Sequence, residues 1–168
     1  MIPLKLVAAN DTFGALVALG EVLAANQAVF ITAPEVNGKM PETFGLPDEV
    51  ETGVGLIVET SGSSGKPKRV TLSREAILAS ANAAQIRLGG PGQWLLALPI
   101  NFVAGANVLV RSLVADTQPV LMNTSVPFTA EAFAAADQVP RRHAAVLEDD
   151  VRSEERRVGK ECLRLCRS

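Results

Sequence analysis

The sequence predicts an α/β fold in which a mostly parallel sheet is flanked by helices. Short apolar runs rich in β-branched residues alternate with longer segments whose apolar residues recur at helical spacing. Strands that alternate with helices favour parallel pairing, because the helices supply the crossover connections. The chain has 168 residues, of which 48% are hydrophobic and 20% charged, so it can bury the core of about one domain.

The first helix is predicted to begin at Asp11, a residue type that caps helices, and to run to about Ala25. Its apolar residues recur at helical spacing: Phe13, Leu16, Val17, Leu19, Val22 and Leu23. The β-branched run Ala28–Thr32 follows and predicts a short buried strand. The segment Pro34–Glu51 is rich in Pro, Gly, Asn and acidic residues, which predicts a loop.

The next predicted strand is Val54–Glu59, which leads directly into a segment rich in Gly and Ser. Beyond that segment, Val70–Leu72 is predicted as a short extended return. Ser73 is the predicted N-cap of a helix that reaches about Leu88. The glycines and proline of residues 89–92 then end the helix.

The last part of the predicted fold repeats the alternation of strand and helix. Trp94–Leu98 and Gln118–Met122 are predicted strands, and Ala104–Val114 between them is a predicted helix. A final helix, Ala130–Asp137, is predicted with Thr129 as its cap.

Composition excludes several classes of protein. The formal net charge of −2 gives no electrostatic footprint for nucleic acid or for an anionic membrane. No apolar run reaches the length of a membrane span, and the first residues do not have the pattern of a signal peptide, so the expected location is the cytoplasm. With one His and no Tyr, the sequence predicts neither a His-based metal site nor a Ser–His–Asp triad, and His143 is given no role.

The composition changes abruptly at Val151. The tail 152–168 is strongly basic and contains both cysteines of the chain. Residues 152–162 resemble the in-frame translation of a common short-read sequencing adapter, and residues 166–168 resemble its continuation after a variable index. The alternatives are a natural disordered charged tail and a Cys-x-x-x-Cys metal or redox site, which has too few ligands for a closed zinc site. We predict an adapter-derived, disordered tail and exclude it from the fold.

The segment Thr60–Lys68 has the composition of an anion-binding loop. Directly after an apolar strand it reads Thr60, Ser61, Gly62, Ser63, Ser64, Gly65, Lys66, Pro67 and Lys68. Glycine permits positive φ, so the backbone can aim successive N–H groups at one anion, while hydroxyls and lysines add donors and charge. The glycine spacing differs from that of GxxxxGK[ST]. A flexible linker is the alternative, but it fits poorly with a preceding buried strand.

This segment resembles the signature loop of the adenylate-forming superfamily, which includes acyl-CoA synthetases, peptide-synthetase adenylation domains and luciferases. In that family the loop holds the β- and γ-phosphates of ATP, which implies ATP contacts from every residue of the segment except Pro67. Leu98–Gly105 resembles a second family motif that borders the acyl pocket. The resemblance covers roughly residues 54–122. It implies part of the large N-terminal domain of an adenylate-forming enzyme, with ATP, Mg²⁺ and CoA as its cofactors and co-substrates.

Two features resemble the actinobacterial o-succinylbenzoate–CoA ligases of menaquinone biosynthesis. The loop arrives by residue 60, and Val108–Ser112 resembles an Arg-Ser segment of that branch. The substrate of that branch is a dicarboxylate. Arg111 could hold the carboxylate that is not activated, because a guanidinium binds carboxylates in a bidentate way. Asn101 and Phe102 are candidate walls of the acyl pocket. The alternatives are a surface arginine on an amphipathic helix and an ordinary strand-to-helix loop.

The remaining motifs of the family are absent from the sequence. There is no Tyr and hence no Tyr-Gly-x-Thr-Glu motif, and we find no Thr-Gly-Asp motif and no lid with its catalytic Lys. No catalytic residue is predicted. Residues 1–151 are expected to be a partial AMP-binding domain of an acid–thiol ligase that is inactive alone. The alternatives are a ligase for another carboxylic acid, a non-catalytic ATP- or phosphate-binding fragment, and a fragment without function.

Overall fold

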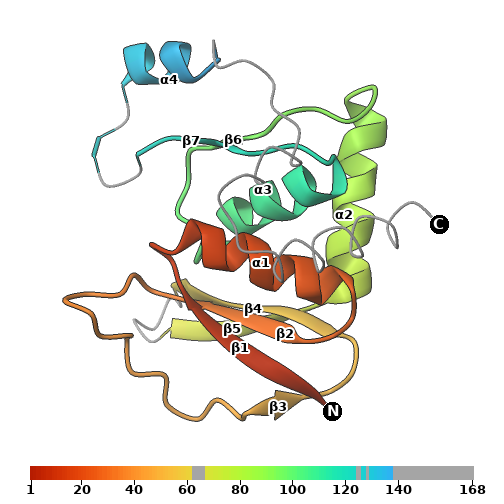
Figure 1. The fold of residues 1–168 in the computed structure, drawn as a ribbon, viewed down its shortest axis with the longest axis vertical. Coiled ribbons are helices and arrows are strands. Elements are labelled where there is room, and N and C mark those ends of the chain that lie inside the picture. The colour runs from red at the N-terminus through yellow and green to blue at the C-terminus, as the bar shows by residue number, and fades with distance from the viewer. Residues whose placement is uncertain (62–66, 124–125, 128, 138–168) are drawn as a thin grey trace, which may run out of the picture.

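The computed structural model describes residues 1–61, 67–123, 126–127 and 129–137 (Figure 1). Its elements follow in the order β1 (Ile2–Ala8), α1 (Thr12–Leu23), β2 (Ala28–Thr32), β3 (Glu49–Val50), β4 (Val54–Ser61), β5 (Pro67–Ser73), α2 (Arg74–Arg87), β6 (Leu95–Leu96), α3 (Val103–Val114), β7 (Val120–Leu121) and α4 (Ala130–Asp137). The predicted α/β class is confirmed.

Parallel pairing forms the centre of the main sheet, whose strand order is β3-β1-β2-β4-β5. β1 pairs with β2, and β2 with β4, in the parallel sense. Both edges are antiparallel, with β3 on β1 and β5 on β4. The segment between β4 and β5 is too short for the crossover connection that parallel pairing requires, so these strands form a hairpin. β6 and β7 make a separate two-stranded parallel sheet.

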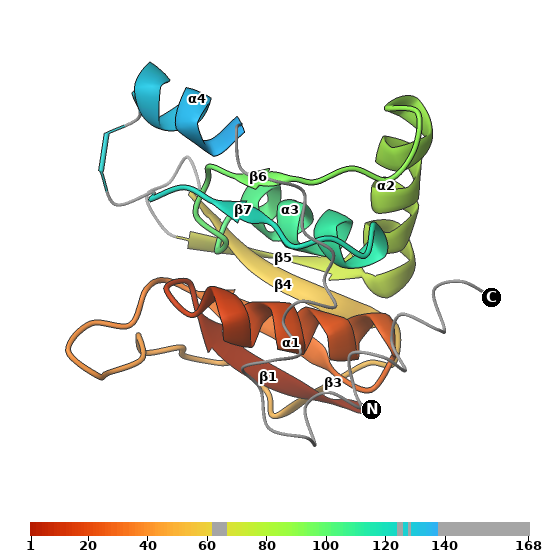
Figure 2. The same ribbon diagram turned by 45° about the horizontal axis from the view of Figure 1, so that its top comes forward.

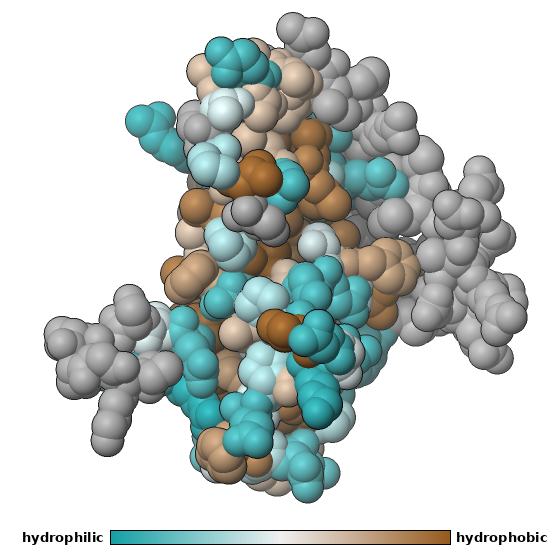
Figure 3. All heavy atoms as spheres, turned by 90° about the vertical axis from the view of Figure 1, so that its left-hand side faces the viewer, coloured by the Kyte–Doolittle hydropathy of each residue, from teal (hydrophilic) through white to brown (hydrophobic). Residues whose placement is uncertain are grey.

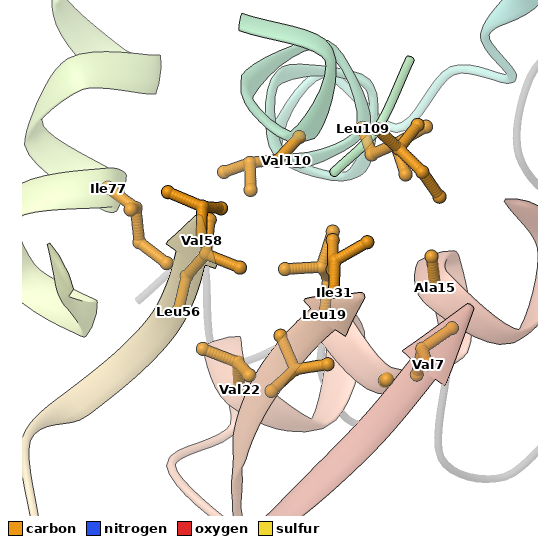
Figure 4. Packing of buried hydrophobic residues seen from close by; sticks show 14 of the residues in the cluster. Val7, Ala15, Leu19, Val22, Ile31, Leu56, Val58, Ile77, Leu109 and Val110 are labelled. Atoms are coloured by element: carbon orange, nitrogen blue, oxygen red, sulfur yellow. The ribbon is translucent and has the colours of Figure 1, made fainter. Parts of the chain in front are cut away.

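Three helices cover one face of the main sheet. In Figures 1 and 2, α1, α2 and α3 lie over this face, and β6 and β7 lie on the far side of α3. The core fills the space between sheet and helices, as Figure 4 shows for ten labelled residues. Its side chains include Ile31 and Val58 from the sheet and Leu19, Ile77 and Leu109 from the helices, all at most 2% exposed.

A second cluster of apolar residues lies on the opposite face of the main sheet. It contains Leu4, Ala28, Phe30 and Ile57, and the partly buried Leu46 packs against it from the loop before β3. β2 is therefore buried on both faces, and all its residues are buried. A central parallel strand covered on both sides is expected to be a continuous apolar run, and the sequence of β2 has this property.

The predicted helix starts are confirmed by their caps. The side chains of Asp11, Ser73 and Thr129 each accept a hydrogen bond from the backbone N–H three residues later, at 2.8, 3.1 and 3.2 Å respectively. These bonds satisfy first-turn donors that have no partner within the helix.

Several strands differ from their predictions, among them β3, which lies in the predicted loop Pro34–Glu51. β1 was not predicted, because its sequence is not rich in β-branched residues and contains Pro3. Proline is tolerated there because Pro3 pairs only with the two-residue β3, while pairing with β2 begins at Leu4. The strands predicted at 94–98 and 118–122 shorten to two residues each, and the return predicted at 70–72 lengthens into β5.

The prediction for the tail 152–168 and the boundary at residue 151 lie outside the described residues, as does His143. Both remain predictions. Among the helices of the described residues, none combines the length and the apolar character that a bilayer span requires.

Candidate functional site

The hairpin of β4 and β5 presents the predicted phosphate segment. Gly62, Ser63, Ser64, Gly65 and Lys66 lie outside the described residues. The residues on either side belong to the strands, where Thr60 pairs with Lys68 and Ser61 with Pro67. The Thr60 hydroxyl donates to the Lys68 carbonyl oxygen at 3.1 Å. The two ends of the segment are thus fixed side by side.

Charge at the base of this hairpin is divided between two neighbouring basic residues. The Arg69 Nε donates to the Glu59 carboxylate at 3.2 Å, and the guanidinium carbon lies 5.5 Å from the centre of the Phe30 ring. These two contacts hold the Arg69 side chain against residues of β4 and β2. The adjacent Lys68 points to the other side of the strand, because successive side chains of a strand alternate, and it is exposed. Lys68 is thus an exposed cation at the base of the hairpin.

The predicted acyl segment forms a tight turn after β6. The Phe102 N–H donates to the Pro99 carbonyl at 3.3 Å, and Phe102 is the N-cap residue of α3. Ile100 anchors the turn in the core at 2% exposure, while Phe102 is 47% exposed. The Asn101 Oδ1 is buried and has no hydrogen-bond partner. An unpaired buried acceptor is costly, so it marks a place where a donor from a ligand or another segment would be stabilising.

The hairpin end and the acyl turn lie on the same side of the molecule. The parallel strands β1, β2, β4, β6 and β7 all point their carboxyl ends to the left in Figure 1, and α3 begins there. Ligands of open α/β sheets bind outside the carboxyl ends of the strands. Figure 3 views this side directly: apolar side chains gather in its upper half, and hydrophilic ones predominate below.

A side-chain clamp ties together two further loops that follow parallel strands. The Asn10 Nδ2 donates to the Glu35 carbonyl at 3.2 Å, and the Asn10 Oδ1 accepts from the Glu35 N–H at 2.8 Å. Asn10 follows β1 and Glu35 follows β2. Sequence reasoning missed this clamp, since nothing local marks two residues so far apart as partners.

Arg111 is not brought next to the acyl turn. It lies in the last turn of α3, about 12 Å along the helix axis from Val103 at the helix start. Its guanidinium carbon is 4.8 Å from the centre of the Trp94 ring, and its Nε is buried without a hydrogen-bond partner. Sequence reasoning did not find Trp94 as the stacking partner. Its only signal is that Trp94 is the single tryptophan of the chain.

The described residues contain no group of three or more His, Cys, Asp or Glu side chains that could hold a metal ion. Phosphate oxygens are themselves ligands of Mg²⁺.

The known proteins reported below as similar to this chain are all named as ligases of the same type. The chain is 39% identical over 125 residues to a protein named "Probable 2-succinylbenzoate--CoA ligase" from Mycobacterium tuberculosis, in both strain CDC 1551 / Oshkosh and strain H37Rv; the match covers 74% of this chain and 33% of the relative. It is 36% identical over 75 residues to the 2-succinylbenzoate--CoA ligase of Enterococcus faecalis strain V583, which covers 44% of this chain and 15% of the relative.

These matches support a relationship to CoA ligases over the matched residues. The chain spans about a third of the length of the mycobacterial relatives, 33%. No protein-family model matches the chain. No solved structure matches it either.

Proposed function

We propose that this chain is the part of an ATP-dependent acid–CoA ligase that holds the phosphates of ATP and borders the acyl pocket. We further propose that the acid is 2-succinylbenzoate, in the menaquinone pathway of the cytoplasm. The similarity to proteins named 2-succinylbenzoate–CoA ligase, 39% over 125 residues, is the observation that carries the proposal. The pairing of both ends of the phosphate segment in one hairpin supports it.

The phosphate contacts are assigned to the segment Thr60–Lys68, apart from Pro67. Its backbone N–H groups and hydroxyls would donate to phosphate oxygens, and Lys66 and Lys68 would balance their charge. The exposed position of Lys68 at the hairpin base supports this role. Mg²⁺, when bound, would supply further charge neutralisation between phosphate oxygens.

The acyl contacts are assigned to Asn101, Phe102 and Arg111. Asn101 supplies a buried amide without a partner for its oxygen, and Phe102 supplies exposed aromatic surface at the start of α3. Arg111 lies about 12 Å along α3 from Val103, so it would bind the end of the acid far from the acyl turn, where the carboxylate that is not activated would lie. Its guanidinium is held against Trp94, which leaves its terminal N–H groups as a preoriented fork.

The proposed reaction has two steps. A carboxylate oxygen attacks the α-phosphorus of ATP and pyrophosphate leaves, giving an acyl-adenylate. The CoA thiol then attacks the acyl carbon and AMP leaves, giving the thioester. The segment Thr60–Lys68 acts in the first step, because it stabilises the charge that develops on the departing pyrophosphate. The motifs absent from the sequence would supply adenine, ribose and lid contacts, so we expect no turnover by the chain alone.

ATP binding by the purified chain tests the phosphate assignment. Each charge-assisted contact is worth about 1.5–3 kcal/mol, so Lys66→Ala and Lys68→Ala should each weaken ATP binding by roughly tenfold or more. Lys5→Ala, which removes an exposed lysine from β1, is the control and should leave binding unchanged. Equal ATP affinity in all variants would contradict the assignment.

The acid is tested on a protein extended to the length of the relatives. We expect ATP–pyrophosphate exchange with 2-succinylbenzoate, and a large rise in KM for this acid in Arg111→Ala. A monocarboxylic benzoate analogue lacks the second carboxylate, so its KM should not respond to the same change. Exchange by the extended protein with fatty acids alone would favour the ligase for another acid.

A further inference from the structure

The first turn of α3 lies unusually close to the backbone that enters the acyl turn. Gly105 is buried, and a Cβ atom built on it would stand 2.3 Å from the Pro99 carbonyl oxygen and 2.7 Å from the Pro99 carbonyl carbon. It would also stand 2.8 Å from the carbonyl oxygen of Leu98. Real Cβ atoms do not approach other atoms this closely, so only glycine fits the position.

The atoms that such a Cβ would meet cannot move aside independently. All are backbone atoms of the segment that leads into the turn, and the ring of Pro99 restricts its own φ. The side chain of Ile100, 2% exposed, fastens the next residue to the core. Any side chain at Gly105 must therefore move either the acyl turn or the start of α3.

Gly20 is a helical glycine in the opposite situation. It lies in α1, and a Cβ added to it would have no atom within 4 Å. Helix propensity alone favours alanine at both positions. The two glycines are therefore matched in conformation and differ in the space around them.

We infer that Gly105 is a positioning residue that sets where Asn101 and Phe102 stand against the acyl pocket. The inference rests on the proposed function for the meaning of that pocket. Because α3 begins directly against Pro99, the turn formed by residues 99–102 is held between the core and the helix. Asn101 and Phe102, the proposed wall of the acyl pocket, are therefore held in one position. A methyl group at residue 105 would displace the wall and change the size of acid that fits.

Amide hydrogen exchange on the full 168-residue chain tests this inference. Two matched first-turn bonds report on it: the Ala106 N–H to the Phe102 carbonyl, 3.0 Å, and the Ala15 N–H to the Asp11 carbonyl, also 3.0 Å. Gly105→Ala should speed exchange at Phe102 and Ala106 by roughly tenfold or more, and leave Ala15 unchanged. Gly20→Ala should speed exchange at none of them. A uniform rise at all these amides in Gly105→Ala would indicate a merely structural role and overturn the inference.

The unaltered chain provides a second measurement if Gly105→Ala does not fold. Nuclear Overhauser effects between the α-protons of Gly105 and protons of residues 98–100 are expected from the close approach, and their absence would overturn the inference. Addition of 2-succinylbenzoate separates this inference from the proposed function. The acid should shift the amide signals of Asn101 and Phe102. A chain that shows the close approach but no such shift would contradict the proposed function alone.

Discussion

β2 and β6 are both parallel strands beside a helix, yet they differ in length, in their number of partner strands and in how completely they are buried. β2 lies between two strands, pairs with both, and has no exposed residue. Within the described residues β6 pairs with β7 alone, for two residues, and Leu121 on β7 is 59% exposed. Both strands come from apolar stretches of about the same predicted length. The difference therefore lies in the neighbours that surround them.

The comparison shows how strand length depends on tertiary contacts. A strand with partners on both sides satisfies its backbone donors and acceptors along its whole length, so regular pairing extends. The backbone hydrogen bonds beside β6 include those from the Val120 N–H to the Trp94 carbonyl at 2.8 Å and from the Met122 N–H to the Leu96 carbonyl at 3.0 Å. An isolated two-stranded sheet is marginal in water, so its pairing ends early.

Truncation of one side chain in each sheet gives the largest expected contrast. Phe30 in β2 is 0% exposed, so Phe30→Ala should lower the free energy of unfolding by about 3–5 kcal/mol. Leu121→Ala should lower it by less than about 0.5 kcal/mol, because the side chain is already largely in water. Urea unfolding of both variants measures the difference. Similar losses would show that the two sheets are equally important to stability.

Removal of a helix cap from each region should give a smaller contrast. Ser73 caps α2, which packs on the core, and Ser73→Ala should cost about 1 kcal/mol of unfolding free energy. Thr129 caps α4, where Phe133 is 46% exposed, so Thr129→Ala should change local opening more than global unfolding. Urea unfolding measures the global loss of stability, and hydrogen exchange at the Ala132 amide measures local opening of α4. An equal loss of unfolding free energy in both variants would contradict the prediction.

The stack of Arg111 on Trp94 is a side-chain contact that joins α3 to the segment leading into β6. Arg111→Ala should cost about 0.5–1 kcal/mol and shift the fluorescence of Trp94, the single tryptophan. Arg87→Ala removes an exposed arginine from the last turn of α2 and serves as the control. Unchanged emission in Arg111→Ala would show that the stack does not persist in solution.

The ion pair at the base of the hairpin should give the smallest effect. Both side chains of Arg69–Glu59 are about a third exposed, at 31% and 36%, so water and salt weaken their attraction. A double-mutant cycle with alanine should give a coupling of about 0.2–1 kcal/mol that falls as salt is added. Arg69→Ala alone should cost more than this coupling, because it also loses the contact with Phe30. A coupling that does not respond to salt would indicate a pair shielded from solvent.

Prediction from the sequence succeeded where the responsible atoms are close along the chain. The caps at Asp11, Ser73 and Thr129 and the periodic helices after them depend on bonds within one turn, and the structure confirms them. β1 was missed because its strand conformation depends on pairing with β2, about twenty-four residues later. For the site, the segment Thr60–Lys68 was found from its composition, and its contacts with phosphate stay a prediction.

The sequence by itself determined the helices, the buried central strand and the placing of a phosphate-type segment directly after an apolar strand. These depend on periodicity, on short polar caps and on residue composition, which act over a few residues. Tertiary structure decided that the two ends of that segment pair in a hairpin, that Arg111 stacks on Trp94, and that α3 begins against Pro99 at Gly105. Each of these depends on which surfaces meet when the layers pack, because close contact between backbones or side chains is set by the whole core and not by neighbours in the chain.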